Sequence, residues 1–316
     1  MKIRLSNLFF CSLCILYSCK SEFKEITKAE YNEEESITID GIFKANINNK
    51  IMIIGEKKWY DITHNGSKYV VVGDGGLVSS STDGTNWREP QKIGTAYYYK
   101  SIAYGNGIFV MGGYGGYVST STDGITWSTP TVIKQSMSIS SVIYAQNKFI
   151  AVGGGYAFYS TNGINWTECI YTANVCFNHV VFGNGKFVTI GTDSRTLKGY
   201  VSTSTDGITW GTASNFTDNI TWFNIGFGNG KFVAVGDKGY IMTSTDGGIS
   251  WSNLKQITTA INWLDIIYSN GKFIVVGSDG YTSTSTDGVN WETPIQIKDE
   301  SGNLVTSPLY GICETF

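Results

Sequence analysis

The amino-acid sequence predicts an all-β fold built from one repeated unit of about forty residues. A short segment recurs six times and ends in a tryptophan each time, with 40, 39, 44, 41 and 40 residues between successive tryptophans (Trp87, Trp127, Trp166, Trp210, Trp251 and Trp291). The chain has 38 Gly, 19 Tyr and 16 Phe against 4 Pro, which is typical of many short strands joined by tight turns. No stretch has the periodicity of an amphipathic helix. Strands alone, repeating at this period, predict a β-propeller.

The sixth repeat shows how each unit divides into four strands. An apolar run at Leu264–Tyr268 is followed by Asn270 and a glycine, a two-residue hairpin signal because both residues tolerate positive φ. Lys272–Val276 forms the second predicted strand, Tyr281–Thr286 the third and Asn290–Ile297 the fourth. An isolated blade of this kind would expose two apolar faces, so the repeats are expected to stack around an axis.

The two ends of the repeat region predict how the ring closes. Complete repeats run from Trp59 to Ile297, and the segments left over at the two ends together amount to nearly one more repeat. Leu309–Ile312 resembles a first strand, and Ser36–Gly55 offers the remaining ones. We therefore predict seven four-stranded blades in a single domain over residues 36–316, the last blade closed by both chain ends, which would remove exposed sheet edges. Six blades with irregular ends is the alternative.

The recurring Ser-Thr-Asp-Gly-x-x-Trp segment, seen at Ser121–Trp127 and, in an eight-residue form, at Ser244–Trp251, resembles the Asp-box or bacterial neuraminidase repeat. The resemblance covers six repeats. In that family the box is a structural turn between the third and fourth strands of a blade. The residue types agree with this role, because Asp can accept hydrogen bonds from backbone N–H groups, Gly permits positive φ, and Trp packs between sheets. Asn162 replaces Asp in the third box.

The N-terminus has the features of an export signal. Lys2 and Arg4 precede the apolar run Leu8–Tyr17, which is too short to span a bilayer, and the run leads into Cys19. Residues 1–18 resemble a bacterial lipoprotein signal peptide, which implies acylation of Cys19 and attachment to a membrane of the cell envelope. Residues 19–35 are polar and rich in charge, as expected of a flexible tether. The two envelope membranes are not distinguished.

Cysteine and charge content limit the classes of ligand. Beyond the signal segment and Cys19, only Cys169, Cys176 and Cys313 remain. Cys169 and Cys176 could form a disulfide or stay as two free thiols, and the sequence leaves both interpretations open. Two histidines and these spacings predict no metal site, and no cofactor motif is present. The net charge of −3 offers no basic stripe, which argues against a nucleic-acid partner. We expect a monomer.

Alignment of the repeats on the aromatic residue of the second strand reveals candidate ligand-binding positions. Ten residues before that aromatic lies a mostly aromatic column, with Trp59, Tyr99, Trp222 and Trp263 as candidates. Eight residues before it lies a polar column of Asp61, Ser101, Ser141, His179, Asn224 and Asp265. This polar column is expected near the central channel, on the face that carries the irregular blade connections. These side chains could bind a polar ligand, or they could cap strand ends while the aromatics pack between blades.

The same inventory makes enzymatic activity an unfavoured alternative. Sialidases, which share the Asp-box, hold the carboxylate of their substrate with three arginines, whereas only Arg88 and Arg195 follow the signal segment. Paired carboxylates such as Asp61 and Asp265 could instead serve a glycoside hydrolase. The motif combination also resembles repeats of bacterial surface and phage-tail proteins and, distantly, sortilin and photosystem II assembly factor propellers. That resemblance implies a non-enzymatic scaffold on a bacterial membrane, which recognises a protein or a glycan through the blade-connection face.

Overall fold

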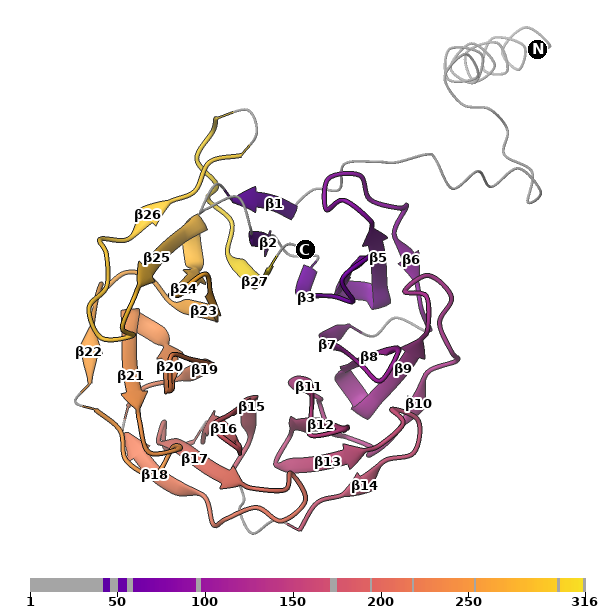
Figure 1. Ribbon diagram of the computed structural model, residues 1–316, viewed down its shortest axis with the longest axis horizontal. Coiled ribbons are helices and arrows are strands. Elements are labelled where there is room, and N and C mark those ends of the chain that lie inside the picture. The colour runs from indigo at the N-terminus through magenta and orange to yellow at the C-terminus, as the bar shows by residue number, and fades with distance from the viewer. Residues whose placement is uncertain are drawn as a thin grey trace, which may run out of the picture. The chain divides into compact units, whose positions relative to one another are not determined.

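The computed structural model describes residues 42–45, 51–55, 59–94, 98–170, 175–193, 195–217, 219–252, 254–299 and 302–314. From Ile37 onward the chain forms one compact unit. Within this unit the sheets are arranged in a ring around a central axis (Figure 1). The predicted signal segment, Cys19 and the tether lie outside the described residues.

Six blades of the ring are four-stranded and antiparallel, and in each the first strand lies nearest the axis. The innermost strands are β3 (Trp59–His64), β7 (Tyr99–Gly105), β11 (Ser141–Ala145), β15 (Phe177–Gly183), β19 (Trp222–Gly228) and β23 (Trp263–Ser269). The second strands are β4 (Tyr69–Gly73), β8 (Ile108–Gly113), β12 (Lys148–Gly153), β16 (Lys186–Thr192), β20 (Lys231–Gly236) and β24 (Lys272–Gly277). The third strands are β5 (Leu77–Ser81), β9 (Tyr117–Ser121), β13 (Tyr156–Ser160), β17 (Gly199–Ser204), β21 (Tyr240–Ser244) and β25 (Tyr281–Ser285).

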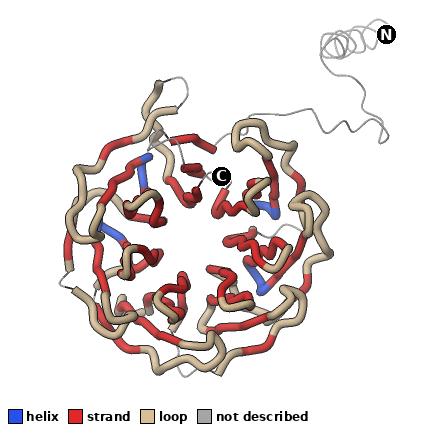
Figure 2. Tube along the Cα trace, viewed as in Figure 1, coloured by secondary structure: helices blue, strands red, loops and turns tan. Residues whose placement is uncertain are grey.

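The outermost strands are short, and in most blades they have only two residues. They are β6 (Gln91–Lys92), β10 (Thr131–Val132), β14 (Thr167–Glu168), β18 (Ser214–Thr217), β22 (Lys255–Gln256) and β26 (Ile295–Gln296). The longer fourth strand predicted at Asn290–Ile297 is therefore shortened to β26. Short 3₁₀ turns join the second and third strands of four blades (Figure 2), at η1 (Asp74–Gly76), η2 (Tyr114–Gly116), η3 (Asp237–Gly239) and η4 (Ser278–Gly280).

Both ends of the described chain contribute to one further sheet, which has three strands in the order β1 (Ile42–Ala45), β2 (Ile51–Gly55) and β27 (Leu309–Glu314). Strand β27 lies between the innermost strands β23 and β3, and it pairs with β2 in antiparallel register. The prediction of a single β-propeller is confirmed. Its count of four-stranded blades is six, as in the alternative, and the predicted seventh blade is corrected to this three-stranded sheet.

Most hairpins between first and second strands follow the Asn-Gly signal in the sequence, whereas the third blade turns at Gln146 and Asn147. In the fifth blade Asn229 has a φ of 46° and Gly230 a φ of 75°, the left-handed pair that a two-residue hairpin requires. This turn lets Phe227 pair with Phe232 across the hairpin. The register of each blade is therefore encoded locally.

The recurring Ser-Thr-Asp-Gly turn has a side chain at its centre that binds the backbone. Asp83 Oδ1 accepts hydrogen bonds from the N–H groups of Thr85 and Asn86, both at 2.7 Å, and Gly84 has a φ of 69°. The indole N–H of Trp87 donates to the Gly84 carbonyl at 3.3 Å. Burial raises the pKa of Asp83, but the hydrogen bonds from Asn86 and Thr85 outweigh it and lower the pKa to about 2. The aspartate therefore stabilises a turn, as predicted.

The core of the ring lies between neighbouring sheets. Seven clusters of buried apolar side chains among the described residues each join two adjacent sheets. At one junction Val188 and Ile190 of the fourth blade pack against Trp222 and Phe232 of the fifth. Because each sheet buries both faces against neighbours, the blades support one another around the ring.

Candidate functional site

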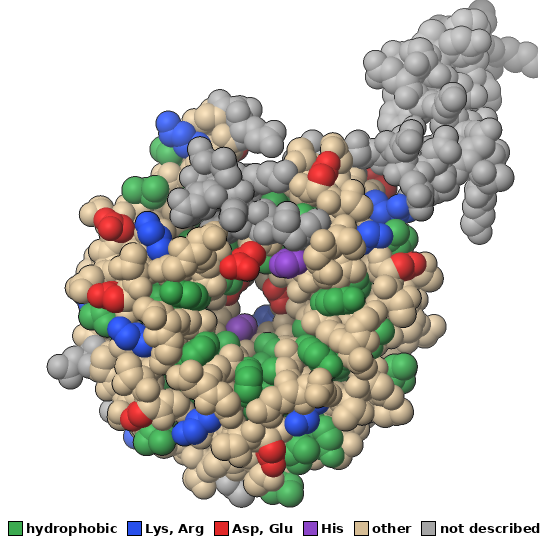
Figure 3. Space-filling model, in the orientation of Figure 1, with side chains coloured by type: hydrophobic (Ala, Val, Ile, Leu, Met, Phe, Trp, Pro, Cys, Tyr) green, Lys and Arg blue, Asp and Glu red, His purple; other side chains and the backbone are tan. Residues whose placement is uncertain are grey.

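A cavity of about 760 Å³ lies at the mouth of the central channel. Its walls come from the innermost strands, together with residues that lie in or beside the blade connections, such as Ser140, Cys176 and Thr221. Thr192 and Leu197, in the insert between β16 and β17, also line it. In the space-filling view the ring is open at its centre, and charged and histidine side chains lie around the opening (Figure 3). The lining residues that belong to the blade connections and to this insert place the cavity on the face that carries the irregular connections.

In five of the six innermost strands, and in β27, one residue reaches this cavity at a β-bulge. In β3, for example, Trp59 pairs with Gly73 and Asp61 with Val72, which leaves Tyr60 without an opposite residue. The same register shift occurs in four more innermost strands and in β27. The resulting extra residues, all of which line the cavity, are Tyr60, Lys100, Asn178, Phe223, Leu264 and Tyr310. Ser140, directly before β11, lines the cavity at the corresponding place.

We call these cavity-lining residues the bulge ring (Tyr60, Lys100, Ser140, Asn178, Phe223, Leu264 and Tyr310). In the six repeats the bulge ring lies between the two columns selected from the sequence, and the sequence reasoning missed it. Its side chains are aromatic, basic, hydroxyl, amide and aliphatic, whereas the position before it is apolar or aromatic in every blade and the position after it is polar in every blade. That contrast was visible in the sequence as one position without a common residue class between two positions that each have one. It could have been found by asking which column differs most between blades.

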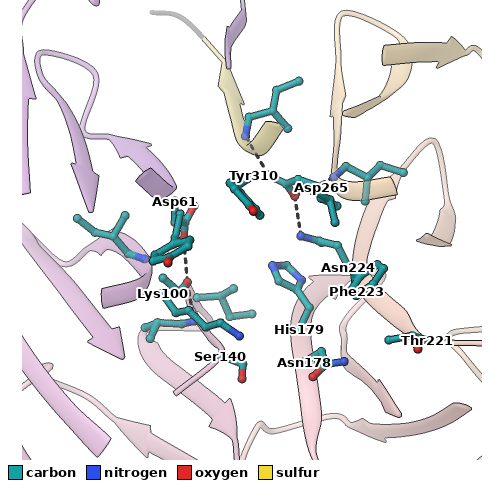
Figure 4. A pocket seen from close by; sticks show the side chains of 18 of the residues that line it. Asp61, Lys100, Ser140, Asn178, His179, Thr221, Phe223, Asn224, Asp265 and Tyr310 are labelled. Carbon is teal, nitrogen blue, oxygen red and sulfur yellow. Dashed lines mark hydrogen bonds between the residues drawn. The ribbon is translucent and has the colours of Figure 1, made fainter. Parts of the chain in front are cut away.

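The polar column reaches the cavity in five of its six positions. Asp61, Ser101, His179, Asn224 and Asp265 line the cavity, while Ser141 is fully buried and is not among the lining residues. Figure 4 shows Asp61, His179, Asn224 and Asp265 around a common space. The structure therefore brings the predicted polar residues together, although they lie up to 204 positions apart in the chain, as Asp61 and Asp265 do.

The aromatic column does not reach the cavity. Trp59, Tyr99, Trp222 and Trp263 expose 1% of their surface or less and belong to the packing between blades. The indole N–H of Trp222 is already bonded to Thr217 Oγ1 at 2.7 Å. The predicted role of these four residues as a stacking surface for a ligand does not agree with this burial. The aromatic side chains that do line the cavity are Tyr60, Phe223 and Tyr310.

Most polar-column side chains bind the neighbouring sheet. Asp61 Oδ2 accepts the N–H of Ile102 at 2.8 Å, and Ser101 Oγ accepts the N–H of Val142 at 3.0 Å. Asp265 Oδ2 accepts the N–H of Ile312 at 2.9 Å. In these bonds the side chains satisfy backbone groups of the neighbouring strand. This is the strand-capping role that the sequence left open as the alternative to ligand binding.

Asp61 and Asp265 are coupled through the channel. Burial raises the pKa of Asp61 to about 6, against hydrogen bonds from Ile102, Ser101 and Ile62 that lower it. Burial and the charge of Asp61 raise the pKa of Asp265 well above its ordinary value. A raised pKa is also what a general acid needs. However, each carboxylate already accepts three hydrogen bonds from the fold, which favours a structural or binding role over the glycoside hydrolase alternative.

Two buried polar atoms in the lining lack a hydrogen-bond partner. They are Nδ1 of His179 and Oδ1 of Asn224. Burial lowers the pKa of His179 to about 4, against a backbone hydrogen bond with Ile225 that raises it, so the ring is neutral at pH 7. Buried polar atoms are usually paired in native proteins, so these two are places where a ligand could bind.

Lys100 and a row of tyrosines complete the surroundings. Lys100 is exposed overall, yet desolvation by the channel walls lowers its pKa. The ring of Tyr310 lies 5.7 Å from that of Tyr60, Tyr60 lies 5.8 Å from Tyr98, and Tyr98 lies 5.4 Å from Tyr114 (centroid distances). Tyr114 is half exposed. The row therefore leads from the cavity onto the surface of the same face.

The three cysteines of the folded unit are free thiols. Cys169 and Cys176 are not bonded to each other, so the possible disulfide does not form, and Cys313 is free as well. The Cys169 thiol is buried and donates to the Gly207 carbonyl at 3.3 Å. Among the described residues no group of three or more metal-ligating side chains converges. Within the same residues, no helix has the length and apolar character to cross a bilayer.

Comparison with known proteins agrees with this architecture. The DUF6242 beta propeller domain family matches residues 170–313. No curated protein matches the chain. The solved structure titled "YCF48 bound to D1 peptide" is similar with a TM-score of 0.64 and 17% identity, over 88% of this chain and 97% of that one. YCF48 from Cyanidioschyzon merolae is similar with a TM-score of 0.59 and 16% identity, over 83% of this chain and 96% of that one. The WD40 propeller domain of Doa1 has a TM-score of 0.60 and 13% identity, over 87% of this chain and 97% of that one. At these identities the similarity establishes the β-propeller fold.

Proposed function

We propose that this protein is a non-enzymatic binding scaffold that takes its ligand at the channel mouth on the blade-connection face. The observation that carries the proposal is the bulge ring. The turns, the Asn-Gly hairpins and the inter-blade core repeat from blade to blade, while the bulge residues differ in chemistry and all reach one cavity. A rigid repeated frame that presents one variable set of side chains is how many binding proteins are built.

A polypeptide is the ligand class that the cavity favours. Its volume of about 760 Å³ lies in the range of roughly 300–1,000 Å³ that is typical of ligand pockets. Phe223, Leu264 and Leu197 supply apolar surface, while Asn178 and Lys100 supply polar groups. The tyrosine row beyond the cavity adds the residue type that is enriched at protein interfaces. The similar structure of YCF48 bound to D1 peptide supports this choice.

The binding site is tested with the compact unit that starts at Ile37. We expect it to select ligands from a peptide array, with a glycan array as the alternative. Phe223→Ser should weaken binding about tenfold or more, because Phe223 lines the cavity. Ile164→Ser is the matched control, since Ile164 is 64% exposed in the Ser-Thr-Asn-Gly turn of the third blade, on the face with the recurring turns. Equal loss in both variants, or loss in the control alone, would place the ligand elsewhere.

We infer further that the scaffold is displayed as a monomer on a bacterial membrane by acylation of Cys19. The support is the sequence pattern of Lys2, Arg4 and the apolar run before Cys19. Metabolically supplied labelled palmitate should enter the protein and be lost in Cys19→Ala, because the thiol is the acceptor. The Cys176→Ala variant should keep the label. Unchanged labelling of Cys19→Ala would contradict the anchor.

A further inference from the structure

Asp61 and Asp265 are two carboxylates at the cavity, and within the described part of the chain neither has a cationic partner. They extend from β3 and β23, on either side of β27, and both line the cavity. Each retains some accessible surface. Ion pairs among the described residues join Lys134 to Glu168 and Arg195 to Asp193, and they involve neither of these two carboxylates.

The hydrogen bonds of these carboxylates leave room for a ligand. A carboxylate offers about four acceptor sites. Asp61 uses three of them, for the N–H groups of Ile62 and Ile102 and the hydroxyl of Ser101. Asp265 also uses three, for the N–H groups of Ile266 and Ile312 and the amide of Asn224. One acceptor site therefore remains on each carboxylate.

A third acceptor comes from Asn224. Its Nδ2 donates to Asp265 Oδ1 at 2.6 Å, and this bond leaves Oδ1 of Asn224 without a partner. The residue is only 7% exposed, and it lines the cavity beside Asp265 (Figure 4). An unpaired oxygen at such a depth costs stability unless a donor reaches it.

Apart from Lys100, the other titratable and aromatic groups around this point carry no charge that would compete for the carboxylates. The rings of Tyr60 and Tyr310 lie 5.7 Å apart in an edge-to-face arrangement and line the same cavity. Burial raises the pKa of the Cys313 thiol well above its ordinary value, as do the charges of Asp61 and Asp265, so the thiol is neutral. His179 is neutral at pH 7, and Lys100 is the one basic side chain among the lining residues.

We propose that Asp61, Asp265 and Asn224 bind the primary ammonium group of a lysine side chain in a polypeptide partner, with Tyr60 and Tyr310 beside its methylene stem. An ammonium group has three N–H donors and no acceptor, which matches three acceptors with none to spare. Its charge compensates the two carboxylates, and the tyrosine rings give the methylene stem apolar surface to pack against. This inference rests on the proposed function, because it places the lysine in the same cavity.

The proposal predicts a coupling between binding and protons. A bound cation favours ionised carboxylates, so it should displace protons from Asp61 and Asp265. Near pH 6 Asp61 is half protonated before binding, since its pKa is about 6. Affinity should therefore rise between about pH 5 and pH 7.5, and protons should be released on binding near pH 6. His179 and Lys100 face the same cavity. His179 is already mostly neutral across this window because its pKa is about 4, whereas a bound cation would favour loss of a proton from Lys100 with the same sign as from the carboxylates.

The experiment is calorimetric titration of the full-length protein with Nα-acetyl-lysine amide at millimolar concentration. Nα-acetyl-norleucine amide, which lacks the ammonium group, is the matched probe, and n-pentylamine separates a free amine from a lysine residue. We expect the lysine probe to bind at least about tenfold more tightly than the norleucine probe. Titrations in two buffers of different ionisation enthalpy at about pH 6 should show proton release.

Variants locate the site. Asn224→Ala should weaken lysine binding about tenfold, whereas Asn165→Ala, at an exposed asparagine of the third-blade turn, should leave it unchanged. Equal affinity for the lysine and norleucine probes, proton uptake on binding, or tighter binding of n-pentylamine than of the lysine probe would overturn the proposal. A peptide that binds through Phe223 without a lysine would overturn it too, while leaving the proposed function intact.

Discussion

Asp61 joins two blades of the ring: its Oδ2 atom accepts the backbone N–H of Ile102 at 2.8 Å, although the two residues are 41 positions apart. The donor directly follows Ser101, which occupies the place of Asp61 in the next blade. Ser101 repeats the link to Val142. Because each innermost strand is the inner edge of its sheet, a polar side chain of the neighbouring blade can satisfy N–H groups that the ladder leaves unpaired. The polar column is therefore part of the frame as well as of the cavity wall.

This dual role predicts the effect of removing one link. Ser101→Ala should lower the free energy of unfolding by about 1–3 kcal/mol, because it leaves the Val142 N–H without its acceptor at a buried position. Urea unfolding measures the change. Ser67→Ala, in an exposed turn, is the control and should change stability by less than about 0.5 kcal/mol. Equal stability of the two variants would show that the link contributes nothing.

A second prediction concerns the close approach of neighbouring blades. A Cβ atom at Gly228 would lie 2.0 Å from Cγ of Tyr268 in the next blade, too close for the ring to remain in place. Gly228→Ala should therefore destabilise the protein by about 1–3 kcal/mol, the usual effect of overpacking. Gly211→Ala is the control, because its nearest neighbour is the Thr203 carbonyl oxygen at 3.4 Å, an ordinary contact. Thermal unfolding compares them, and an unperturbed Gly228→Ala would refute this packing.

The third prediction follows from His179. Burial keeps its ring neutral and lowers its pKa from 6.5 to about 4, so the folded state binds fewer protons than the unfolded state between these values. Its contribution to the free energy of unfolding therefore falls as the pH decreases through this window, by about 3 kcal/mol in total. Asp61, with its pKa raised to about 6, acts in the opposite direction and is present in both proteins compared below.

The measurement is urea unfolding of the wild type and His179→Gln at about pH 7 and about pH 4.5. The free energy of unfolding of the wild type should fall relative to that of the variant as the pH decreases, because glutamine does not titrate. His64→Gln serves as the control for the other histidine of the chain and should show a smaller change, since His64 is less completely desolvated. A constant difference between wild type and His179→Gln at both pH values would contradict the shift.

Sequence and structure agree most closely where the chemistry is local. The Asn229–Gly230 hairpin and the turn around Asp83 depend on residues within a few positions, and their patterns predicted them. Repetition then supplied the ring, because a four-stranded unit repeated without helices has few other ways to bury its faces. The location of the polar column at the channel also followed from its place at the start of each innermost strand.

Features that depend on register or on contacts between blades were not predictable in this way. The bulge that turns Phe223 into the cavity is a shift of one residue in strand pairing, and no residue type marks it uniquely. The sequence alone does not tell whether the neighbouring Trp222 is exposed or buried. Its burial depends on packing between the fourth and fifth blades. The number of strands in the closing sheet likewise depends on pairing between segments at opposite ends of the chain.

The last prediction concerns that closing sheet. Removal of residues 309–316 would delete β27, which pairs with β2 and contacts both β23 and β3. It would also expose the apolar surface that Leu309 and Ile312 bury, and it would remove the N–H group that Asp265 binds. Because every blade depends on its neighbours, the truncated protein should unfold at a clearly lower temperature, and all blades should be destabilised. Calorimetry of the truncated and intact proteins measures this. A protein shortened only by its last two residues, which follow β27, is the control and should melt as the intact chain does. An unchanged melting temperature after removal of the whole segment would mean that the six four-stranded blades are stable without the sheet that joins the chain ends.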